Sequence, residues 1–185
     1  TVITPKPGIS EFMATYDLAS LYPNILLAFN KSPDVRGVFL KTLEKTMIMR
    51  EELRVKCKAD PDNILLENQQ LGVKYLNNSY YGYLGLQNGR MYIKELAAFV
   101  TSTGRELNQF LQDVARSKGF EVIFGDTDSI GVISVNTIQI GKELETHLNN
   151  ELANWSDERG CKIHFKLKFE KLYRRILFKA DKKGE

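Results

Sequence analysis

The chain has 185 residues, enough for one ordinary domain with a hydrophobic core or for a domain that carries an insertion. Its formal net charge is +3, so any affinity for nucleic acid has to come from a local basic patch rather than from the overall charge. The sequence contains no run of 18 apolar residues and no secretory signal peptide, which indicates neither membrane insertion nor secretion. Cys57 and Cys161 lack a Cys-x-x-Cys spacing, which argues against a zinc site. We therefore expect a soluble, intracellular protein and assign it to no compartment.

The first half of the chain is predicted to hold one strand followed by helices. The stretch EFMATYDL (11–18) has the pattern of a strand, and the segment after it turns near Pro23. Two helical patterns of similar length follow, over 38–58 and 64–81. The stretch ADPDN (59–63) between them is rich in turn residues. Because this link is short, we expect the two helices to form an antiparallel hairpin.

The second half alternates helices with strands. A helix is expected over 92–117, two strands over 120–124 and 130–135, a helix over 137–155, and one or two closing strands within 162–180. Without the helical hairpin, the order is strand, helix, strand, strand, helix, strand. This order is typical of an α+β, ferredoxin-like (split βαβ) fold, in which helices cover one face of an antiparallel sheet. In that topology the first strand and the later strand hairpin lie side by side at the centre of the sheet.

Three aspartates are candidates for a cation site. Asp126 and Asp128 lie two apart in FGDTDSI (124–130), and Asp17 closes the first strand. If the topology brings the three together, unpaired carboxylates at such short range would be unfavourable without a cation. Two Mg²⁺ ions about 3.5–4 Å apart would turn such a cluster into a phosphoryl-transfer site. The alternative is a solvated turn with three separate, exposed aspartates, and spacing alone does not distinguish the two.

The helical hairpin carries a second candidate site. Arg50 and Arg54 are four residues apart on its first helix, and Lys74, Asn78 and Tyr81 share one face of its second helix. Cations, an amide and a phenol on one face can hold a polyphosphate and a stacked base. The alternative is an ordinary solvated helix face with ion pairs along it.

Three segments together resemble a known family. DLASLYPNI (17–25), KYLNNSYYG (74–82) and FGDTDS (124–129) are similar, in order, to the polymerase motifs D-x-x-S-L-Y-P-S-I, K-x-x-x-N-S-x-Y-G and Y-G-D-T-D-S of family B DNA polymerases. The chain departs from these motifs at Asn24, where Ser is usual, and at Phe124, where Tyr is usual. The resemblance covers essentially the whole chain.

The resemblance implies a palm domain with inserted fingers. The ferredoxin-like part would be the palm, in two segments at 1–37 and 86–185, and the helical hairpin at 38–85 would be the fingers. We recognise no exonuclease segment and no thumb in this sequence, so we expect a piece of a longer protein. The family also has a basic K-K-x-Y motif that holds the primer, and Lys182-Lys183 approach it but are followed by Gly184 and Glu185.

The resemblance also implies a role for each motif residue. Asp17 and Asp128 would be the catalytic carboxylates that bind two Mg²⁺ ions, with the Leu18 carbonyl as a further metal ligand and Asp126 as a supporting carboxylate. Backbone N–H groups of Ser20, Leu21 and Tyr22 would cradle the triphosphate, and the Tyr22 ring would exclude a ribose 2′-OH as a steric gate. Four residues of the fingers would bind the triphosphate: Arg50, Arg54, Lys74 and Asn78. Tyr81, also in the fingers, would probe the nascent base pair.

The implied function is DNA synthesis directed by a template. A primer 3′-OH would attack a dNTP, and pyrophosphate would leave. The partners would be primer–template DNA and dNTP, without a membrane; a processivity factor is compatible with the family but leaves no visible feature in this segment. Two alternatives stay open: a catalytically inactive, polymerase-like DNA-binding or scaffolding module, and another palm-fold nucleotidyltransferase such as a reverse transcriptase, an RNA polymerase or a nucleotide cyclase.

Overall fold

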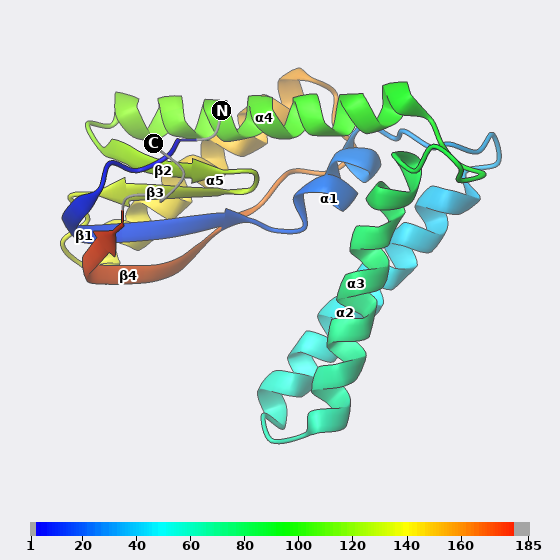
Figure 1. Cartoon of the computed structure of the whole chain (residues 1–185), viewed down its shortest axis with the longest axis horizontal. Helices are drawn as coiled ribbons and strands as arrows, with labels where there is room; N and C mark the ends of the chain where they lie inside the picture. Colours follow the sequence, from blue (N-terminus) through cyan, green and yellow to red (C-terminus); the bar gives the residue numbers. More distant parts are fainter. Residues whose placement is uncertain (1–2, 180–185) are drawn as a thin grey trace. The chain divides into compact units, whose positions relative to one another are not determined.

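A computed structural model describes residues 3–179, which form four strands and five helices. In chain order they are β1 (Gly8–Leu18), α1 (Leu21–Ala28), α2 (Val38–Ala59), α3 (Ile64–Leu84), α4 (Lys94–Ser117), β2 (Glu121–Asp126), β3 (Ser129–Ile133), α5 (Ile138–Glu158) and β4 (Leu167–Phe178) (Figure 1). The Lys182-Lys183 sequence, compared above with the primer-binding motif, lies outside the described residues. None of the helices within the described range has the length and apolar composition needed to cross a bilayer.

The chain forms two compact units. One unit combines the segment that ends at Leu21 with the segment that begins at Ser102, and the other unit is Tyr22–Thr101. The second unit therefore contains the whole helical hairpin predicted at 38–85, together with α1 apart from its first residue and the first turns of α4.

The first unit is built on a four-stranded antiparallel sheet with the order β2-β3-β1-β4. β1 pairs with β3 on one side and with β4 on the other. The predicted neighbourhood of the first strand and the later hairpin is thus confirmed, with Tyr16 opposite Ile130 and Asp17 opposite Ser129. A single strand, β4, accounts for the predicted closing strands within the described range.

Helix α5 packs closely against the β1–β4 side of this sheet. The buried Tyr16 side chain donates a hydrogen bond from its hydroxyl to the Gly141 carbonyl, at 3.0 Å, and its ring makes an edge contact with Phe169. A side chain at position 141 would place its Cβ only 2.8 Å from the Phe169 ring, so glycine is what permits the close approach of α5 to β4. Leucines of α4 and α5 complete the core of this unit, at Leu107, Leu111, Leu144, Leu148 and Leu152.

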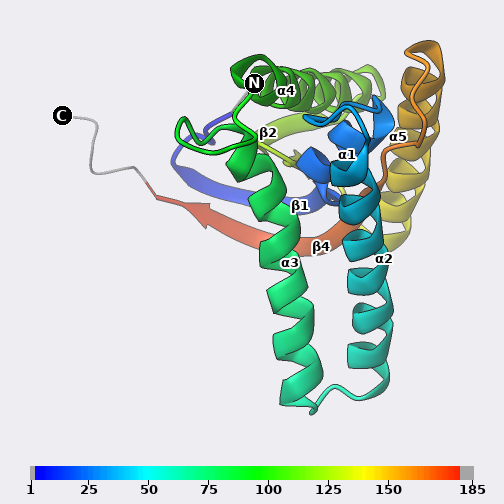
Figure 2. The same ribbon diagram turned by 90° about the vertical axis from the view of Figure 1, so that its right-hand side faces the viewer.

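The second unit contains the antiparallel α2–α3 hairpin (Figure 2). α2 begins where Asp34 accepts hydrogen bonds from the backbone N–H groups of Val38 and Phe39, at 2.7 and 3.1 Å. Asn63 caps α3 by accepting a hydrogen bond from the Leu66 N–H, at 3.2 Å. These side chains satisfy first-turn amides that have no partner within a helix, which explains why the helices start there. α3 continues to Leu84, one turn beyond the predicted end.

Candidate active site

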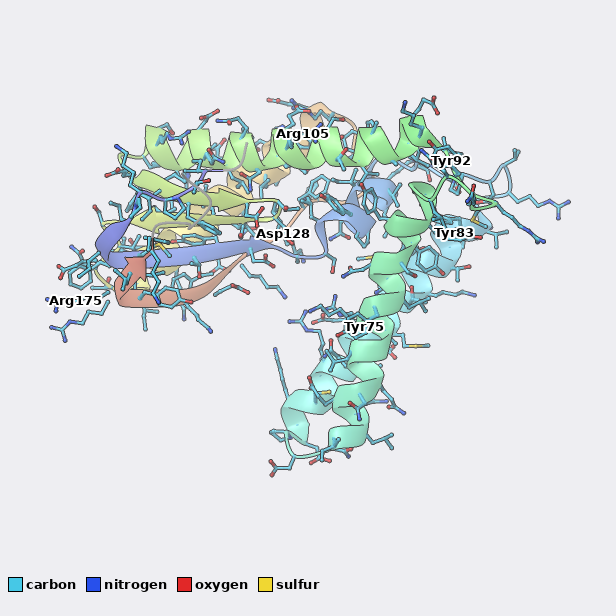
Figure 3. The ribbon with its side chains drawn as sticks, in the orientation of Figure 1. Tyr75, Tyr83, Tyr92, Arg105, Asp128 and Arg175 are labelled. Carbon is cyan, nitrogen blue, oxygen red and sulfur yellow. The ribbon has the colours of Figure 1, made fainter. Side chains whose placement is uncertain are left out.

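The end of β1 and the turn between β2 and β3 are joined by backbone contacts. The Leu18 N–H donates a hydrogen bond to the Asp128 carbonyl, at 2.7 Å, and Asp17 lies opposite Ser129 in the strand register. Figure 3 labels Asp128 at this end of the sheet. Two predicted metal-binding residues that are far apart in the sequence, Asp17 and Asp128, are therefore brought to the same end of one sheet.

Asp126 is placed differently from Asp128. Ser129 of β3 lies between Asp126 and Asp17: it pairs with Asp126 of β2 on one side and with Asp17 of β1 on the other. The backbones of Asp126 and Asp17 are therefore two strand spacings apart, each of roughly 4.8 Å. The exposed Asp126 carboxylate accepts a hydrogen bond from the Thr127 hydroxyl, at 3.1 Å. Within residues 3–179, no three acidic, histidine or cysteine side chains converge closely enough to hold a metal ion together. The expected cluster of three carboxylates is thus not formed by side chains alone, and the ligand set of Asp17, the Leu18 carbonyl and Asp128 stays a prediction.

The half-buried Asp128 carboxylate lies in an acidic environment. Burial raises its pKa above the usual range, and the negative charges of Asp126 and Glu170 raise the pKa further. Glu170 is the extra residue of a bulge in β4, because its neighbours Phe169 and Lys171 pair with the consecutive β1 residues Tyr16 and Thr15. Carboxylate oxygens that repel one another are suited to a hard divalent cation, because such a cation removes the repulsion. The donor chemistry at this end of the sheet therefore fits Mg²⁺.

Glu170 was not predicted as a site residue from the sequence. The stretch LKFEKLY gives no motif, and the acidic side chain stands between two lysines, Lys168 and Lys171, on a partly exposed strand. The signal becomes visible only when β4 is known to lie beside β1, because that pairing brings Glu170 within electrostatic range of Asp128.

The segment after β1 turns sharply into α1. The Ala19 N–H donates to the Lys166 carbonyl, at 2.9 Å, and Ser20 adopts a left-handed backbone conformation with φ of 49°. α1 then begins at Leu21, so the backbone N–H groups of Leu21 and Tyr22 belong to its first turn. The positive end of a helix dipole attracts anions, and these amides lie four and five residues after Asp17 in the chain. The triphosphate cradle of Ser20, Leu21 and Tyr22 stays a prediction.

Two aromatic residues of the second unit, taken from two different motifs, lie in contact. The ring centroids of Tyr22 in α1 and Tyr81 in α3 are 4.5 Å apart, with an angle of 44° between the ring planes. Both side chains are half-buried. The predicted steric gate and the predicted base-probing residue therefore form one aromatic pair.

A row of polar groups runs along the α2–α3 hairpin toward that pair. Arg50 of α2 donates from Nε to the Gln70 side chain of α3, at 3.3 Å, and burial lowers its pKa, as does the neighbouring charge of Arg54. Gln70, Lys74 and Asn78 follow at intervals of four residues, so they share a face of α3. Arg50 of α2 is thus hydrogen-bonded to the residue of α3 that lies one turn before Lys74.

The other predicted triphosphate-binding residues of the hairpin, Arg54, Lys74 and Asn78, have different surroundings. Arg54 forms an exposed ion pair with Glu51 of the same helix, at 3.1 Å. Such a pair is typical of a solvated helix face, the alternative to a triphosphate site given above. The side chains of Lys74 and Asn78 are exposed, and neither forms a hydrogen bond or an ion pair with another residue in the described range. Lys74 and Asn78 are accordingly the members of the row best able to meet an incoming anion.

One buried polar residue of α3, Asn77, stands at a position of the motif where no particular residue is required. Asn77 is only 1% exposed, and neither its amide nitrogen nor its amide oxygen has a hydrogen-bond partner among the described residues. It lies one turn before Tyr81, on the inner side of the helix. An unpartnered buried amide costs stability, so Asn77 is a position where the second unit is not optimised for folding.

Comparison with known proteins agrees with these motifs. Residues 31–184 match the family model described as DNA polymerase family B. The chain is 33% identical to DNA polymerase 2 of Aeropyrum pernix over 98% of its own length, and 36% identical to a DNA polymerase of Archaeoglobus fulgidus over 71% of its length. The structure is similar to that of the family B DNA polymerase from Pyrobaculum calidifontis, with a TM-score of 0.67 and 28% identity over 99% of this chain. The chain belongs to DNA polymerase family B.

The chain spans only about a quarter of these relatives. It covers 25% of the Aeropyrum pernix protein, 20% of the Archaeoglobus fulgidus protein and 26% of the Pyrobaculum calidifontis chain. The match to the family model begins after Asp17, Leu18 and Tyr22, whereas the alignment with the Aeropyrum pernix relative extends over nearly the whole chain.

Proposed function

We propose that this chain is the palm-and-fingers segment of a DNA-directed DNA polymerase. The sheet with α4 and α5 would be a ferredoxin-like palm, formed by 1–37 and 86–185, and the α2–α3 hairpin within 38–85 would be the fingers. The strand order β2-β3-β1-β4 supports this proposal, because it is the order of a split βαβ fold.

One observation carries the proposal. The Leu18 N–H donates to the Asp128 carbonyl at 2.7 Å, which joins the first and third motifs at the end of β1 although more than a hundred residues separate them in the sequence. Asp17 and Asp128 would hold two Mg²⁺ ions there, together with the Leu18 carbonyl. When bound, Mg²⁺ favours the deprotonated primer hydroxyl and offsets the negative charge that develops on the phosphate oxygens.

The residues of the chain would then bind and align the reactants. The first-turn amides of α1 would bind the triphosphate, and Lys74 and Arg50 would offset its charge. The primer 3′-OH attacks the α-phosphorus, a new phosphoester bond forms as the bond to pyrophosphate breaks, and the hydroxyl proton passes to solvent. Because the protein supplies no covalent group, its contribution would be alignment and charge compensation.

The Tyr22–Tyr81 pair would supply selection. Tyr22 would occupy the space of a 2′-OH, and Tyr81 would contact the nascent base pair. Their contact, at 4.5 Å between centroids, supports a shared role because each ring restricts the rotamers open to the other.

The proposal is tested by primer extension with the full-length protein. We expect Mg²⁺-dependent incorporation of the dNTP complementary to the template, little incorporation of NTP, and loss of activity when the metal is chelated. Incorporation of NTP in preference to dNTP would favour another palm-fold nucleotidyltransferase. Binding of primer–template DNA without extension, in the presence of Mg²⁺ and dNTP, would favour an inactive DNA-binding module.

A further inference from the structure

The turn that carries Asp128 is contacted by a buried side chain of α4. Asn108 is 2% exposed, and its Nδ2 lies 3.1 Å from the Ser129 carbonyl and 3.3 Å from the Asp126 carbonyl. The Thr127 carbonyl is more distant, at 3.5 Å. An amide nitrogen has two protons to donate, so Asn108 can bind the carbonyls on both sides of the turn at once.

A second buried amide fixes the orientation of Asn108. Gln112, one turn later on α4 and 1% exposed, donates from Nε2 to Asn108 Oδ1 at 2.6 Å. Arg116 donates in turn to Gln112 Oε1, at 3.3 Å, and to Asp113, at 3.1 Å. Because arginine can only donate, it sets the direction of the whole relay: each amide accepts from the side of Arg116 and donates toward the turn.

The turn has a conformation that its own sequence does not favour. Only two residues, Thr127 and Asp128, separate the register partners Asp126 and Ser129. Thr127 has a φ of 23°, a left-handed value that favours glycine or asparagine and costs free energy for a β-branched residue. The turn also holds a carboxylate close to two others, Asp126 and Glu170. A strained turn that carries like charges needs support from outside, and Asn108 supplies it.

We propose that Asn108 is a positioning residue for the metal-binding carboxylate of Asp128, and that Gln112 is the residue that keeps Asn108 in its donating orientation. The inference rests on the proposed function, because it assigns these amides to the same metal site. Leu18 holds the turn at the Asp128 carbonyl, and Asn108 holds it at the Asp126 and Ser129 carbonyls. With the backbone fixed at three points, the direction of the Asp128 Cα–Cβ bond is fixed, which limits where its carboxylate can lie. The competing interpretation is that the two amides only satisfy polar groups in the core.

Metal affinity, measured apart from activity, separates the two interpretations. Free Mn²⁺ is titrated by electron paramagnetic resonance against the full-length protein and its Asn108→Leu variant, without nucleotide or DNA. We expect the Mn²⁺ dissociation constant to rise about tenfold or more, as for other residues that orient a metal ligand from behind. We also expect kcat for dNTP incorporation to fall by a similar factor, whereas KM for dNTP changes little.

The control is Leu111→Ala, which removes buried volume from the same helix but leaves the side-chain hydrogen bonds of Asn108 and Gln112 in place. This variant is expected to lose thermal stability but to retain Mn²⁺ affinity and kcat well below its melting temperature. Gln112→Leu provides a second test that leaves Asn108 in place, with an expected rise of a few-fold in the Mn²⁺ dissociation constant. It also keeps the inference testable if Asn108→Leu fails to fold.

Unchanged Mn²⁺ affinity and kcat in folded Asn108→Leu would overturn the inference and leave the proposed function intact. The same holds for Gln112→Leu: an unchanged Mn²⁺ dissociation constant would overturn its role in orienting Asn108. Absence of both Mn²⁺ binding and extension in the unsubstituted protein would overturn the inference together with the proposed function.

Discussion

Tyr22 and Tyr81 stand in ring contact inside the second unit, with their centroids 4.5 Å apart, although they come from the first and second of the three motifs. Tyr22 is the second residue of α1, and Tyr81 lies in the last turns of α3. A substitution of either ring therefore changes the surroundings of the other. This coupling shapes what is expected when the proposed steric gate is removed.

Tyr22→Ala should admit ribonucleotides. Without the ring, a 2′-OH no longer overlaps protein atoms, so the ratio of NTP to dNTP incorporation should rise, while dNTP incorporation falls far less than in the aspartate variants described below. Loss of the aromatic pair should cost about 0.5–1.5 kcal/mol of unfolding free energy beyond the lost burial. Primer extension with both nucleotides, together with thermal unfolding, measures the two effects.

Tyr22→Phe is the matched control, because it keeps the ring and loses only the hydroxyl. It should retain rejection of ribonucleotides. A Tyr22→Ala variant that is destabilised but still rejects ribonucleotides would show that Tyr22 is only a packing residue.

Lys74→Ala should weaken nucleotide use without weakening DNA binding. A charge-assisted hydrogen bond is worth about 1.5–3 kcal/mol, so kcat/KM for dNTP should fall by roughly 10- to 100-fold. Lys58, an exposed lysine in the last turn of α2, is the control position for lost positive charge. Steady-state kinetics and primer–template affinity are measured for both variants; a defect in DNA affinity alone for Lys74→Ala would place Lys74 on the nucleic-acid side.

Asn77→Leu should stabilise the protein. Both polar atoms of this side chain are buried without a partner among the described residues, so an apolar side chain of similar size removes a desolvation penalty of about 1–3 kcal/mol. Asn68→Leu, at an exposed position of the same helix, should change stability by no more than about 0.5 kcal/mol. Urea unfolding of both variants checks this, and a destabilised Asn77→Leu would mean that the amide has a partner in solution.

Asp128→Asn should stabilise the protein at neutral pH while removing activity. Its folded-state pKa is raised, chiefly by burial, so ionisation costs the folded state more than the unfolded state. The cost is absent below the ordinary aspartate pKa near 3.9, grows as the pH rises through the raised folded value, and is constant above it. The gain in melting temperature of Asp128→Asn should therefore be largest at neutral pH and should disappear in acid.

Mg²⁺ gives an independent check on the same carboxylate. A cation that binds only the folded state raises the melting temperature, so Mg²⁺ should stabilise the unsubstituted protein and stabilise Asp128→Asn much less. Asp62→Asn, in the exposed turn between α2 and α3, should respond to Mg²⁺ like the unsubstituted protein. Equal stabilisation of all three proteins would contradict metal binding at Asp128.

The sequence predicted the elements and much of the pairing because their signals are local. Strand alternation, the turn residues at 59–63 and the helical periods are short-range patterns, and they gave the helical hairpin and the place of β1 beside β3. The separation of Asp126 from Asp17 was not predicted. This separation arises because β2, which carries Asp126, lies at the edge of the sheet. The spacing of two residues between Asp126 and Asp128 does not indicate which strand is at the edge.

The residues that the sequence missed act across elements. Glu170 becomes relevant only through the pairing of β4 with β1, and Asn108 and Gln112 only through the packing of α4 on the strand turn. In the sequence they are single polar residues within ordinary strand or helix patterns. Asn77 lies inside a recognised motif, but its burial follows from the packing of α3 and cannot be predicted from the sequence.

Single-turnover dNTP incorporation by the full-length protein, compared among Asp17→Ala, Asp128→Ala and Asp126→Ala, tests the central claim most directly. If Asp17 and Asp128 hold the metals, removing either carboxylate removes charge stabilisation needed mainly in the transition state, and the rate should fall by at least about 10³-fold with the fold retained. Asp126→Ala should lose much less, because Asp126 is exposed on the edge strand. Near-normal incorporation by Asp17→Ala or Asp128→Ala would contradict the assignment of the site.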